Sequence, residues 1–220
     1  MPPPRLPFPR RHEEPLDPVE EERGPVRPAL VVGLGNPGTE YAATRHNVGV
    51  WCVRELARRH GAKFERAGRM DGATVQVAGA VLHLGRPRAY MNESGPPIAA
   101  ELRRLKLPRS RLLVIYDEID LPVGQVRIRL EGGHGGNNGM RSIIAAVGGT
   151  DFPRIRVGVD RPYDDGRPVR DPERVADWVL SRPSEDDRRV LDAAVQSVAD
   201  AVELAAVEGV ELAMNRFNPR

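Results

Sequence analysis

Short runs of consecutive apolar residues alternate with longer amphipathic segments from about residue 29 onward. Apolar runs of this kind are typical of strands in the centre of a parallel or mixed sheet, because such strands are covered on both faces. Three runs fit this description, at 29–34, 112–116 and 155–159. The pattern predicts a single α/β domain with a mixed, mostly parallel twisted sheet flanked by helices.

Three further segments have the composition of strands. Residues 73–77 and 81–84 are separated by a short Ala-Gly-Ala turn, which predicts an antiparallel hairpin. In 125–130 the basic residues Arg127 and Arg129 alternate with apolar ones. Since successive side chains of a strand point to opposite faces, this strand would have one apolar face and one doubly basic face.

Five amphipathic segments have the apolar spacing of helices. The longest, 184–207, begins with Ser184 followed by three acidic residues. Serine is a favourable N-cap, and acidic side chains in the first turn stabilise the positive end of the helix dipole. The predicted helices are 48–60, 98–105, 141–147, 173–180 and 184–207.

Residues 1–28 lack this periodicity. They contain nine of the 21 prolines, together with five arginines and six acidic residues. A segment with this composition buries too little apolar surface to offset the entropy lost on ordering. The sequence therefore predicts a disordered N-terminal tail at 1–28 and a folded domain at 29–220.

Composition narrows the class of protein. The chain is 40% hydrophobic and 29% charged with a net charge of +2, which is ordinary for a globular domain. No apolar run approaches the ~20 residues that span a bilayer, and the N-terminus lacks the apolar segment of a secretory signal. We therefore expect a cytoplasmic protein with no membrane partner. The single cysteine, Cys52, lies in an apolar helical segment, where a cysteine usually packs as a small hydrophobic residue.

The glycine-rich segment GLGNPG at 33–38 has the spacing of a dinucleotide-binding loop. Three features argue against NAD binding. Pro37 removes an N–H from the phosphate cradle, the best-placed acid, Glu55, lies inside a helix, and a hairpin follows where a parallel crossover is required. NAD-dependent oxidoreduction thus remains a remote alternative.

A hydrolytic site is the stronger interpretation of the same region. His46 follows the glycine loop, and an imidazole can take a proton from water near neutral pH when a carboxylate orients it. Asp117 directly follows the apolar run 112–116, so its carboxylate would emerge at the carboxyl end of a strand. Loop carboxamides can hold a carbonyl group or a water molecule without adding charge. The candidates of this kind are Asn36, Asn92 and Asn138.

Together these segments resemble the bacterial peptidyl-tRNA hydrolase family, from about Leu30 to Asn218. Members of this family release peptides from prematurely dissociated peptidyl-tRNA. The resemblance implies an α/β monomer that uses neither metal nor cofactor. It depends on the blocks GLGNPGTEYAATRHNVG (33–49), RPRAYMNESG (86–95), YDEIDLPVGQVRIRLEGGHGGNNGMRSI (116–143), FPRIRVGV (152–159) and NRFN (215–218).

The resemblance also implies a role for individual residues. His46 matches the catalytic histidine of the family, and Asp117 matches its carboxylate partner. The positions that line the pocket for the peptide and the tRNA 3' end are matched by Asn36, Tyr41, Tyr90, Met91, Asn92 and Asn138. Arg127, Arg129 and Arg156 match positions where the family has basic residues that face the phosphates of the tRNA acceptor stem. The implied reaction is hydrolysis of the ester between the peptide and the tRNA 3' ribose, which recycles tRNA from aborted translation.

Two positions in these blocks depart from the family pattern. Asn137 replaces a histidine found in many members, and Glu93 replaces an apolar residue. A rival function also remains open, because some plant relatives of this family serve as RNA-splicing partners. Such a protein would bind RNA without turnover. The retained set of candidate catalytic and amide residues favours the hydrolase, whereas the long tail is the feature that would favour the rival.

Overall fold

A computed structural model of the chain describes residues 24–219. Its main strands are β1 (Leu30–Gly33), β2 (Glu65–Ala67), β3 (Met70–Val77), β4 (Ala80–Pro87), β5 (Leu112–Glu118), β6 (Val126–Arg129) and β7 (Arg154–Gly158). Within the described range these seven strands form one sheet in the order β2-β3-β4-β1-β5-β7-β6. Strands β4, β1, β5 and β7 are parallel, whereas the pairs β2–β3, β3–β4 and β6–β7 are antiparallel.

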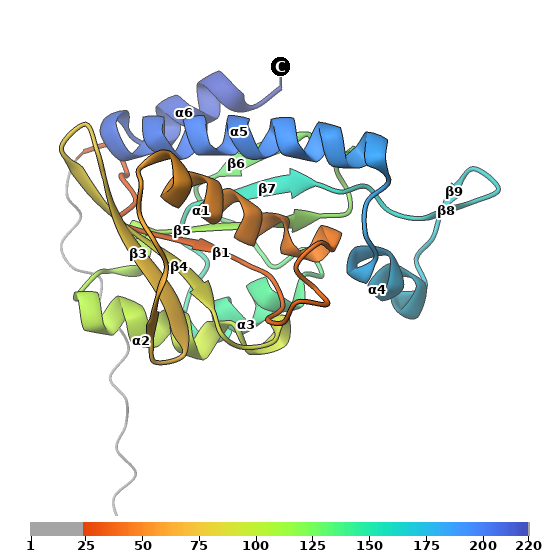
Figure 1. Ribbon diagram of the computed structural model, residues 1–220, viewed down its shortest axis with the longest axis horizontal. Helices are drawn as coiled ribbons and strands as arrows, with labels where there is room; N and C mark the ends of the chain where they lie inside the picture. The colour runs from red at the N-terminus through yellow and green to blue at the C-terminus, as the bar shows by residue number, and fades with distance from the viewer. Residues whose placement is uncertain (1–23, 220) are drawn as a thin grey trace, which may run out of the picture.

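Helices cover both faces of this sheet (Figure 1). They are α1 (Val48–Arg59), α2 (Gly95–Leu105), α3 (Asn138–Val147), α4 (Pro172–Leu180), α5 (Glu185–Glu208) and α6 (Val210–Phe217). Short 3-10 turns precede α1, α2 and β5, namely η1 (Arg45–Asn47), η2 (Met91–Glu93) and η3 (Arg109–Arg111). A small ribbon of β8 (Tyr163–Asp164) and β9 (Arg167–Pro168) projects beside α4 (Figure 1).

Strand β5 separates two hydrophobic cores. Leu113 and Ile115 point into the core shared with α1, α5 and α6, whereas Leu112, Val114 and Tyr116 point into the core shared with α2 and α3. All five side chains are buried. Because the strand is covered on both faces, its sequence is a continuous apolar run rather than an alternating one.

The structure confirms the predicted fold class. The central strands, the β3–β4 hairpin, β6 and the five longer helices lie where the sequence predicted them, with ends shifted by a few residues. The Ser184 hydroxyl caps α5 by accepting a hydrogen bond from the Asp187 backbone N–H at 3.1 Å. Seven short elements were not predicted, namely β2, β8, β9, α6 and the 3-10 turns η1, η2 and η3.

The glycines of the 33–38 segment serve close packing. A Cβ on Gly33 would collide with the backbone of Gly49, and a Cβ on Gly49 would collide with the carbonyl group of Ile115. The first turn of α1 can therefore lie directly against β1 and β5. This packing gives Gly33 and Gly49 a structural role, and the antiparallel hairpin after α1 stands where a dinucleotide fold has a parallel crossover.

The folded domain begins slightly before residue 29. The carbonyl oxygen of Val26 accepts a hydrogen bond of 2.8 Å from the N–H of Val210 at the start of α6, and Pro28 is buried. These residues, assigned to the tail from the sequence, are therefore packed. The rest of the predicted tail, 1–23, lies outside the described residues, so its disorder stays a prediction.

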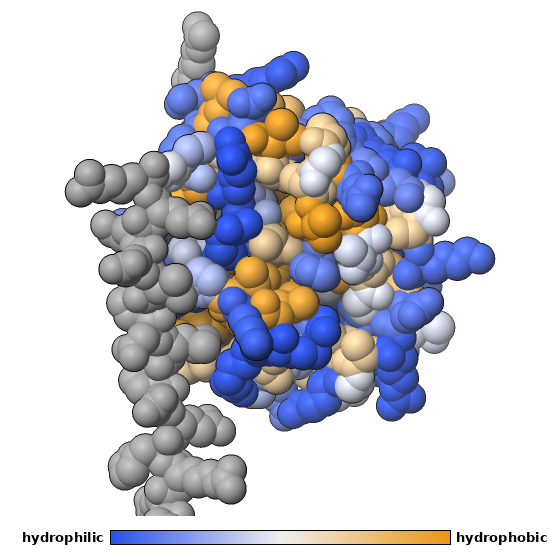
Figure 2. All heavy atoms as spheres, turned by 90° about the vertical axis from the view of Figure 1, so that its left-hand side faces the viewer, coloured by the Kyte–Doolittle hydropathy of each residue, from blue (hydrophilic) through white to orange (hydrophobic). Residues whose placement is uncertain are grey.

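The surface carries scattered apolar side chains. Figure 2 shows one face, on which hydrophobic and hydrophilic residues are intermingled. The exposed large apolar residues come from separate elements, and they are Val81, Tyr90, Tyr163, Leu180, Val190 and Leu212. Among the described residues, no helix is both long enough and apolar enough to cross a membrane.

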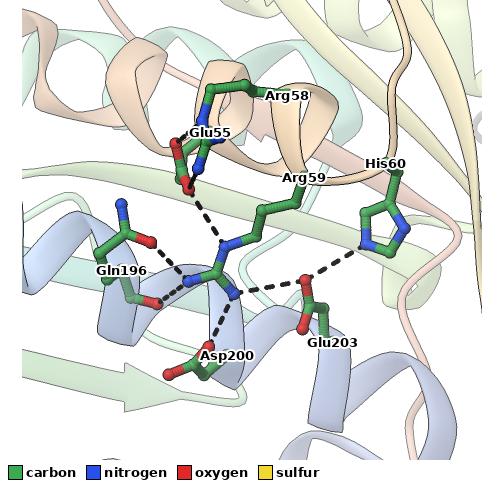
Figure 3. Close-up of polar contacts among 7 residues, drawn as sticks. All are labelled: Glu55, Arg58, Arg59, His60, Gln196, Asp200 and Glu203. Carbon is green, nitrogen blue, oxygen red and sulfur yellow. Dashed lines mark hydrogen bonds and ion pairs between the residues drawn. The ribbon is translucent and has the colours of Figure 1, made fainter.

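A polar network centred on Arg59 joins α1 to α5 (Figure 3). The Arg59 guanidinium donates to Glu55 at 3.2 Å on its own helix and to Asp200 at 2.7 Å on α5. It also donates to the side chain of Gln196 at 2.7 Å. Hydrogen bonds from Arg58, the largest influence, and from Arg59 lower the pKa of Glu55 to about 2 although its partial burial opposes this.

Replacing Glu55 with glutamine should lower the free energy of unfolding by about 1 kcal/mol at neutral pH, since the ion pairs of this network lose their carboxylate. A carboxyl whose folded pKa is depressed stabilises the fold above its ordinary pKa of 4.5. That contribution disappears as the pH falls towards about 2. Urea unfolding at several pH values measures this difference. The variant Glu208→Gln, exposed at the end of α5, is the control, and equal losses in both variants would contradict a specific role for the network.

Candidate active site

The carboxyl ends of β1 and β4 form a topological switch point of the sheet, with β5 on the other side of β1. Strand β1 leads into α1 on one face, whereas β4 leads into α2 on the other face. Chains that leave neighbouring parallel strands in opposite directions open a crevice between them, where α/β proteins bind their ligands. His46 lies in η1, directly after the β1 loop, and Asp117 is the penultimate residue of β5.

The structure brings His46 and Asp117 into direct contact. The Nδ1 atom of His46 lies 2.8 Å from Oδ2 of Asp117, and the two side chains are 15% and 2% exposed. An ionised carboxylate only accepts hydrogen bonds, so Nδ1 carries the proton and donates it. The lone pair of the neutral imidazole is therefore on Nε2, as a general base requires.

Two opposing influences set the pKa of His46. Burial is the larger single influence and acts to lower the pKa, because it disfavours the charged imidazolium. The negative charge of Asp117 and its hydrogen bond to the ring act to raise it, and together they exceed the burial effect. The pKa of His46 is therefore raised above its ordinary value of 6.5.

Arg45 anchors the turn that carries His46. Its side chain is buried and donates to the Ser181 hydroxyl at 2.8 Å and the Arg182 carbonyl at 2.7 Å, and it pairs with Asp187 at 3.0 Å. The guanidinium also lies 3.9 Å from the ring centroid of Trp178 in α4. These contacts fix η1 against the α4–α5 junction. Sequence reasoning missed this role, because the partners lie more than 130 residues away along the chain.

Asn47 holds the loop that presents Asn36. Its Oδ1 accepts from the Asn36 N–H at 2.9 Å, and its Nδ2 donates to the Asn36 carbonyl at 3.0 Å. The Oδ1 atom of Asn36 accepts from the Met91 N–H at 2.8 Å. This last bond assigns the amide orientation of Asn36, so that its Nδ2 remains as a donor. Asn47 was not predicted as a site residue, and only its place beside His46 pointed to it.

Asn137 contacts the other oxygen of the Asp117 carboxylate. Its Nδ2 donates to Oδ1 of Asp117 at 3.4 Å, a long hydrogen bond, while its own Oδ1 accepts from the Met140 N–H at 3.1 Å and caps α3. The asparagine, the first of the two predicted departures from the family pattern, thus supplies a donor to Asp117. The second departure, Glu93, is exposed and lies 3.7 Å from Arg69.

The remaining residues predicted to line the pocket lie in the Asn36 loop, in or beside η2 and at the start of α3. The rings of Tyr41 and Tyr90 meet edge to face, with centroids 6.4 Å apart. Met91 is buried beneath Gly139 at the start of α3, so η2 packs against α3. The exposed side chains of Asn92 and Asn138 lie on these two adjoining elements.

The predicted basic residues lie on the other face of the sheet from Asp117. Arg127 and Arg129 alternate with Val126 and Ile128, which pack in the core with α5 and α6. Arg127 is the cross-strand neighbour of Arg156 on β7. The doubly basic face predicted for β6 is therefore present, and it is extended by a third arginine.

Two arginines on this face of the sheet have partners that reduce the positive charge available to a ligand. Arg156 forms an ion pair of 2.7 Å with the buried carboxylate of Glu118, so its charge is partly compensated. Arg154, the neighbour of Arg129, is buried and donates to the carbonyl groups of Gly133 at 3.0 Å and Thr150 at 2.8 Å. Arg154 therefore stabilises the glycine loop before α3 rather than facing solvent.

Other candidate chemistry is absent from the described residues. No group of three or more His, Cys, Asp or Glu side chains in residues 24–219 converges as metal ligands would. The Cys52 thiol is fully buried, and burial raises its pKa far above the ordinary range. A thiol in that state supplies no thiolate nucleophile.

A doubly wound sheet with an oriented histidine–carboxylate pair at its switch point defines an α/β enzyme equipped for general-base chemistry. A family model described as peptidyl-tRNA hydrolase matches residues 30–220. The chain belongs to the peptidyl-tRNA hydrolase family, and the predicted resemblance is confirmed.

Individual relatives support this assignment over most of their length. The chain is 44% identical to the peptidyl-tRNA hydrolase of Chloroflexus aggregans over 192 residues, which cover 86% of this chain and 98% of the relative. It is 47% identical to that of Alkalilimnicola ehrlichii over 178 residues, with coverage of 79% and 86%. The crystal structure of peptidyl-tRNA hydrolase from Acinetobacter baumannii superposes with a TM-score of 0.81 at 33% identity, covering 88% of this chain and 95% of that one.

Proposed function

We propose that this enzyme hydrolyses the ester bond between the peptide and the 3' ribose of peptidyl-tRNA, with His46 as general base and Asp117 as its orienting partner. Membership of the family supports the reaction and its substrate. The observation that carries the residue roles is the 2.8 Å contact between Nδ1 of His46 and Asp117, which leaves Nε2 free to take a proton.

The chemistry needs one activated water and no covalent nucleophile. Nε2 of His46 removes a proton from the water, and the resulting hydroxide adds to the ester carbonyl to form a tetrahedral intermediate. When the bond from the carbonyl carbon to the ribose oxygen breaks, the imidazolium returns its proton to the ribose. Asp117 stabilises the imidazolium throughout and stays ionised.

Amide side chains would hold the ester and the water. The Asn36 Nδ2 is left as a donor because its Oδ1 is occupied by the Met91 N–H, so it can stabilise the oxyanion. Asn138 accepts from Arg141 at 3.2 Å through its own Oδ1, which likewise leaves its Nδ2 to donate. We assign the peptide and the tRNA 3' end to a pocket lined by Asn36, Tyr41, Tyr90, Met91, Asn92 and Asn138.

The acceptor stem of the tRNA would lie along the basic face made by Arg127, Arg129 and Arg156. Contacts there are to phosphates, which orient the RNA without reading its sequence. This fits an enzyme whose substrate carries any tRNA. The proposal includes action in the cytoplasm as a monomer, without metal or cofactor, since a single chain supplies every group named in the reaction.

The double variant Arg127→Ala/Arg129→Ala should bind tRNA more weakly and with a shallower salt dependence. Removing one phosphate-binding side chain reduces the slope of log affinity against log salt by about 1, so removing both should reduce it by about 2. Filter binding between about 50 and 200 mM salt, a range in which such interactions weaken strongly, measures the slope. Arg103→Ala/Arg104→Ala removes the same charge from α2 as a control. An unchanged slope in the first variant would remove this face from the RNA interface.

The direct test is the rate of ester cleavage on tRNA carrying an N-blocked aminoacyl group, with unblocked aminoacyl-tRNA in parallel. The expected result is cleavage of the blocked substrate and sparing of the free amine, because the neutral pocket amides suit an amide nitrogen better than an ammonium group. If the blocked tRNA binds without being cleaved, the protein is an RNA-binding relative and the proposed reaction fails.

A further inference from the structure

A cavity lies beside the loop that carries Asn36, and Asn36 is one of the residues that line it. Its volume is about 310 Å³, and it opens between this loop, α1 and the ends of β3 and β4. Residues 35–38 form one wall together with Asn47. Charged side chains form the opposite wall, and they are Arg54, Asp71, Arg86 and Arg88.

The arginines of this wall gather around one carboxylate. Arg86 pairs with Asp71 at 2.8 Å, and Arg88 approaches the other oxygen of Asp71 at 3.5 Å. Asp71 and Arg86 are 17% and 28% exposed, so both are substantially shielded from water. The Nε atom of Arg86 is buried and has no hydrogen-bond partner among the described residues.

Arg54 adds a third guanidinium from α1. Burial, and then the positive charge of Arg86, lower its pKa, whereas Asp71 acts in the opposite direction. Because Arg54, Arg86 and Arg88 all line this one cavity, their like charges repel one another. Three cations and one carboxylate, that of Asp71, line the cavity, and the side chain of Glu40 packs over Gly38 at its edge. The cavity thus holds an excess of positive charge.

We propose that this cavity is a binding site for a phosphate group. Neither His46 nor Asp117 lines it, although it shares Asn36 with the proposed substrate pocket. Guanidinium groups present paired N–H donors that match the oxygens of a phosphate, and an anion would relieve the repulsion among the three arginines. The bound phosphate would join β4 and α1 to the Gly35–Gly38 backbone, which carries Asn36. The site rests on charge and contacts, and it does not depend on the proposed reaction.

The test is a titration of 15N-labelled protein with inorganic phosphate at constant ionic strength, with chloride replaced by phosphate. We expect saturable shifts of the amide resonances of Gly35, Gly38 and Arg88. Arg54→Gln and Arg88→Gln should each weaken phosphate binding about tenfold, the effect of losing a charge-assisted hydrogen bond. Asp71→Asn should strengthen binding, because it removes the competing carboxylate.

The control is Arg103→Gln on α2, which makes the same change of net charge on the other face of the sheet. It should leave phosphate binding unchanged. Shifts that do not saturate, or affinities equal in Arg54→Gln, Arg88→Gln and Arg103→Gln, would overturn the site. The spectra themselves report whether each variant is folded.

A second measurement identifies the source of the phosphate. If it belongs to an RNA backbone, tRNA displaces inorganic phosphate, and Arg88→Gln lowers the salt slope of tRNA binding by about 1. If it is a free phosphate, tRNA binding is unaffected by the substitution and both ligands bind together. Neither measurement requires turnover, so failure of this site and failure of the proposed reaction are distinguishable.

Discussion

Replacing Asp117 with asparagine is expected to reduce kcat/KM for N-blocked aminoacyl-tRNA by roughly 10³- to 10⁴-fold, as the corresponding change does in catalytic triads. The carboxylate accepts the Nδ1 proton of His46 at 2.8 Å. An asparagine amide at this position can instead donate to Nδ1, which places the imidazole proton on Nε2. A protonated Nε2 cannot take a proton from water, so the base is lost although the ring remains.

Two controls accompany this substitution. Thermal unfolding and tRNA affinity should change little, since asparagine has nearly the same shape and Asn137 can still hydrogen-bond to its side-chain oxygen. The variant Asp151→Asn, in the exposed ion pair with Arg109, should retain wild-type turnover. A rate for Asp117→Asn within tenfold of wild type would show that the carboxylate does not orient the base.

The pH profile provides a further check on the pair. A general base must be neutral, so kcat/KM of the wild type should rise with pH through a value above 6.5, where the raised pKa of His46 lies. In Asp117→Asn the influences that raise this pKa are lost and burial, which lowers it, remains. The residual activity that comes from the minor tautomer of His46, with Nε2 unprotonated, should therefore rise with pH through a lower value than in the wild type. If the pH at which the rate rises were the same in both proteins, a group other than His46 would control the pH dependence.

Replacing His46 with alanine is expected to lower the rate of ester cleavage by about 10²-fold or more, the usual contribution of a general base. The loss should fall on kcat, because the tRNA surface and the amide donors remain. Residual activity would come from positioning and from stabilisation of the oxyanion by Asn36. Single-turnover cleavage with saturating enzyme separates this chemical step from binding.

His83→Ala is the matched control for that experiment. His83 lies in β4 and contacts only Thr74 among the side-chain hydrogen bonds of the described residues, at 3.2 Å. The His83→Ala variant should cleave substrate at the wild-type rate. A near-normal rate for His46→Ala would remove His46 from the mechanism, whereas equal losses in both histidine variants would point to damaged folding.

Much of the fold could be predicted because its signals are local. The apolar run 112–116 marks β5 without knowledge of its neighbours, and Ser184 marks the start of α5 by a contact with the next turn. Helix α6 was missed because its eight residues span only about two turns, too few for a clear period, and it follows α5 after the single residue Gly209. A hydrogen bond from its first N–H to the Val26 carbonyl ties it to the start of the domain. The ribbon β8–β9 was missed because strands of two residues carry no periodicity.

The sequence by itself determined the family, the fold class and the two residues of the histidine–carboxylate pair, since motifs and apolar runs are properties of short segments. Only the tertiary structure revealed that Arg45 anchors η1 to the α4–α5 junction, that Asn137 reaches Asp117, and that three arginines surround Asp71. These contacts join residues far apart along the chain. Sequence spacing says nothing about such distances, because they arise only when strands and helices pack.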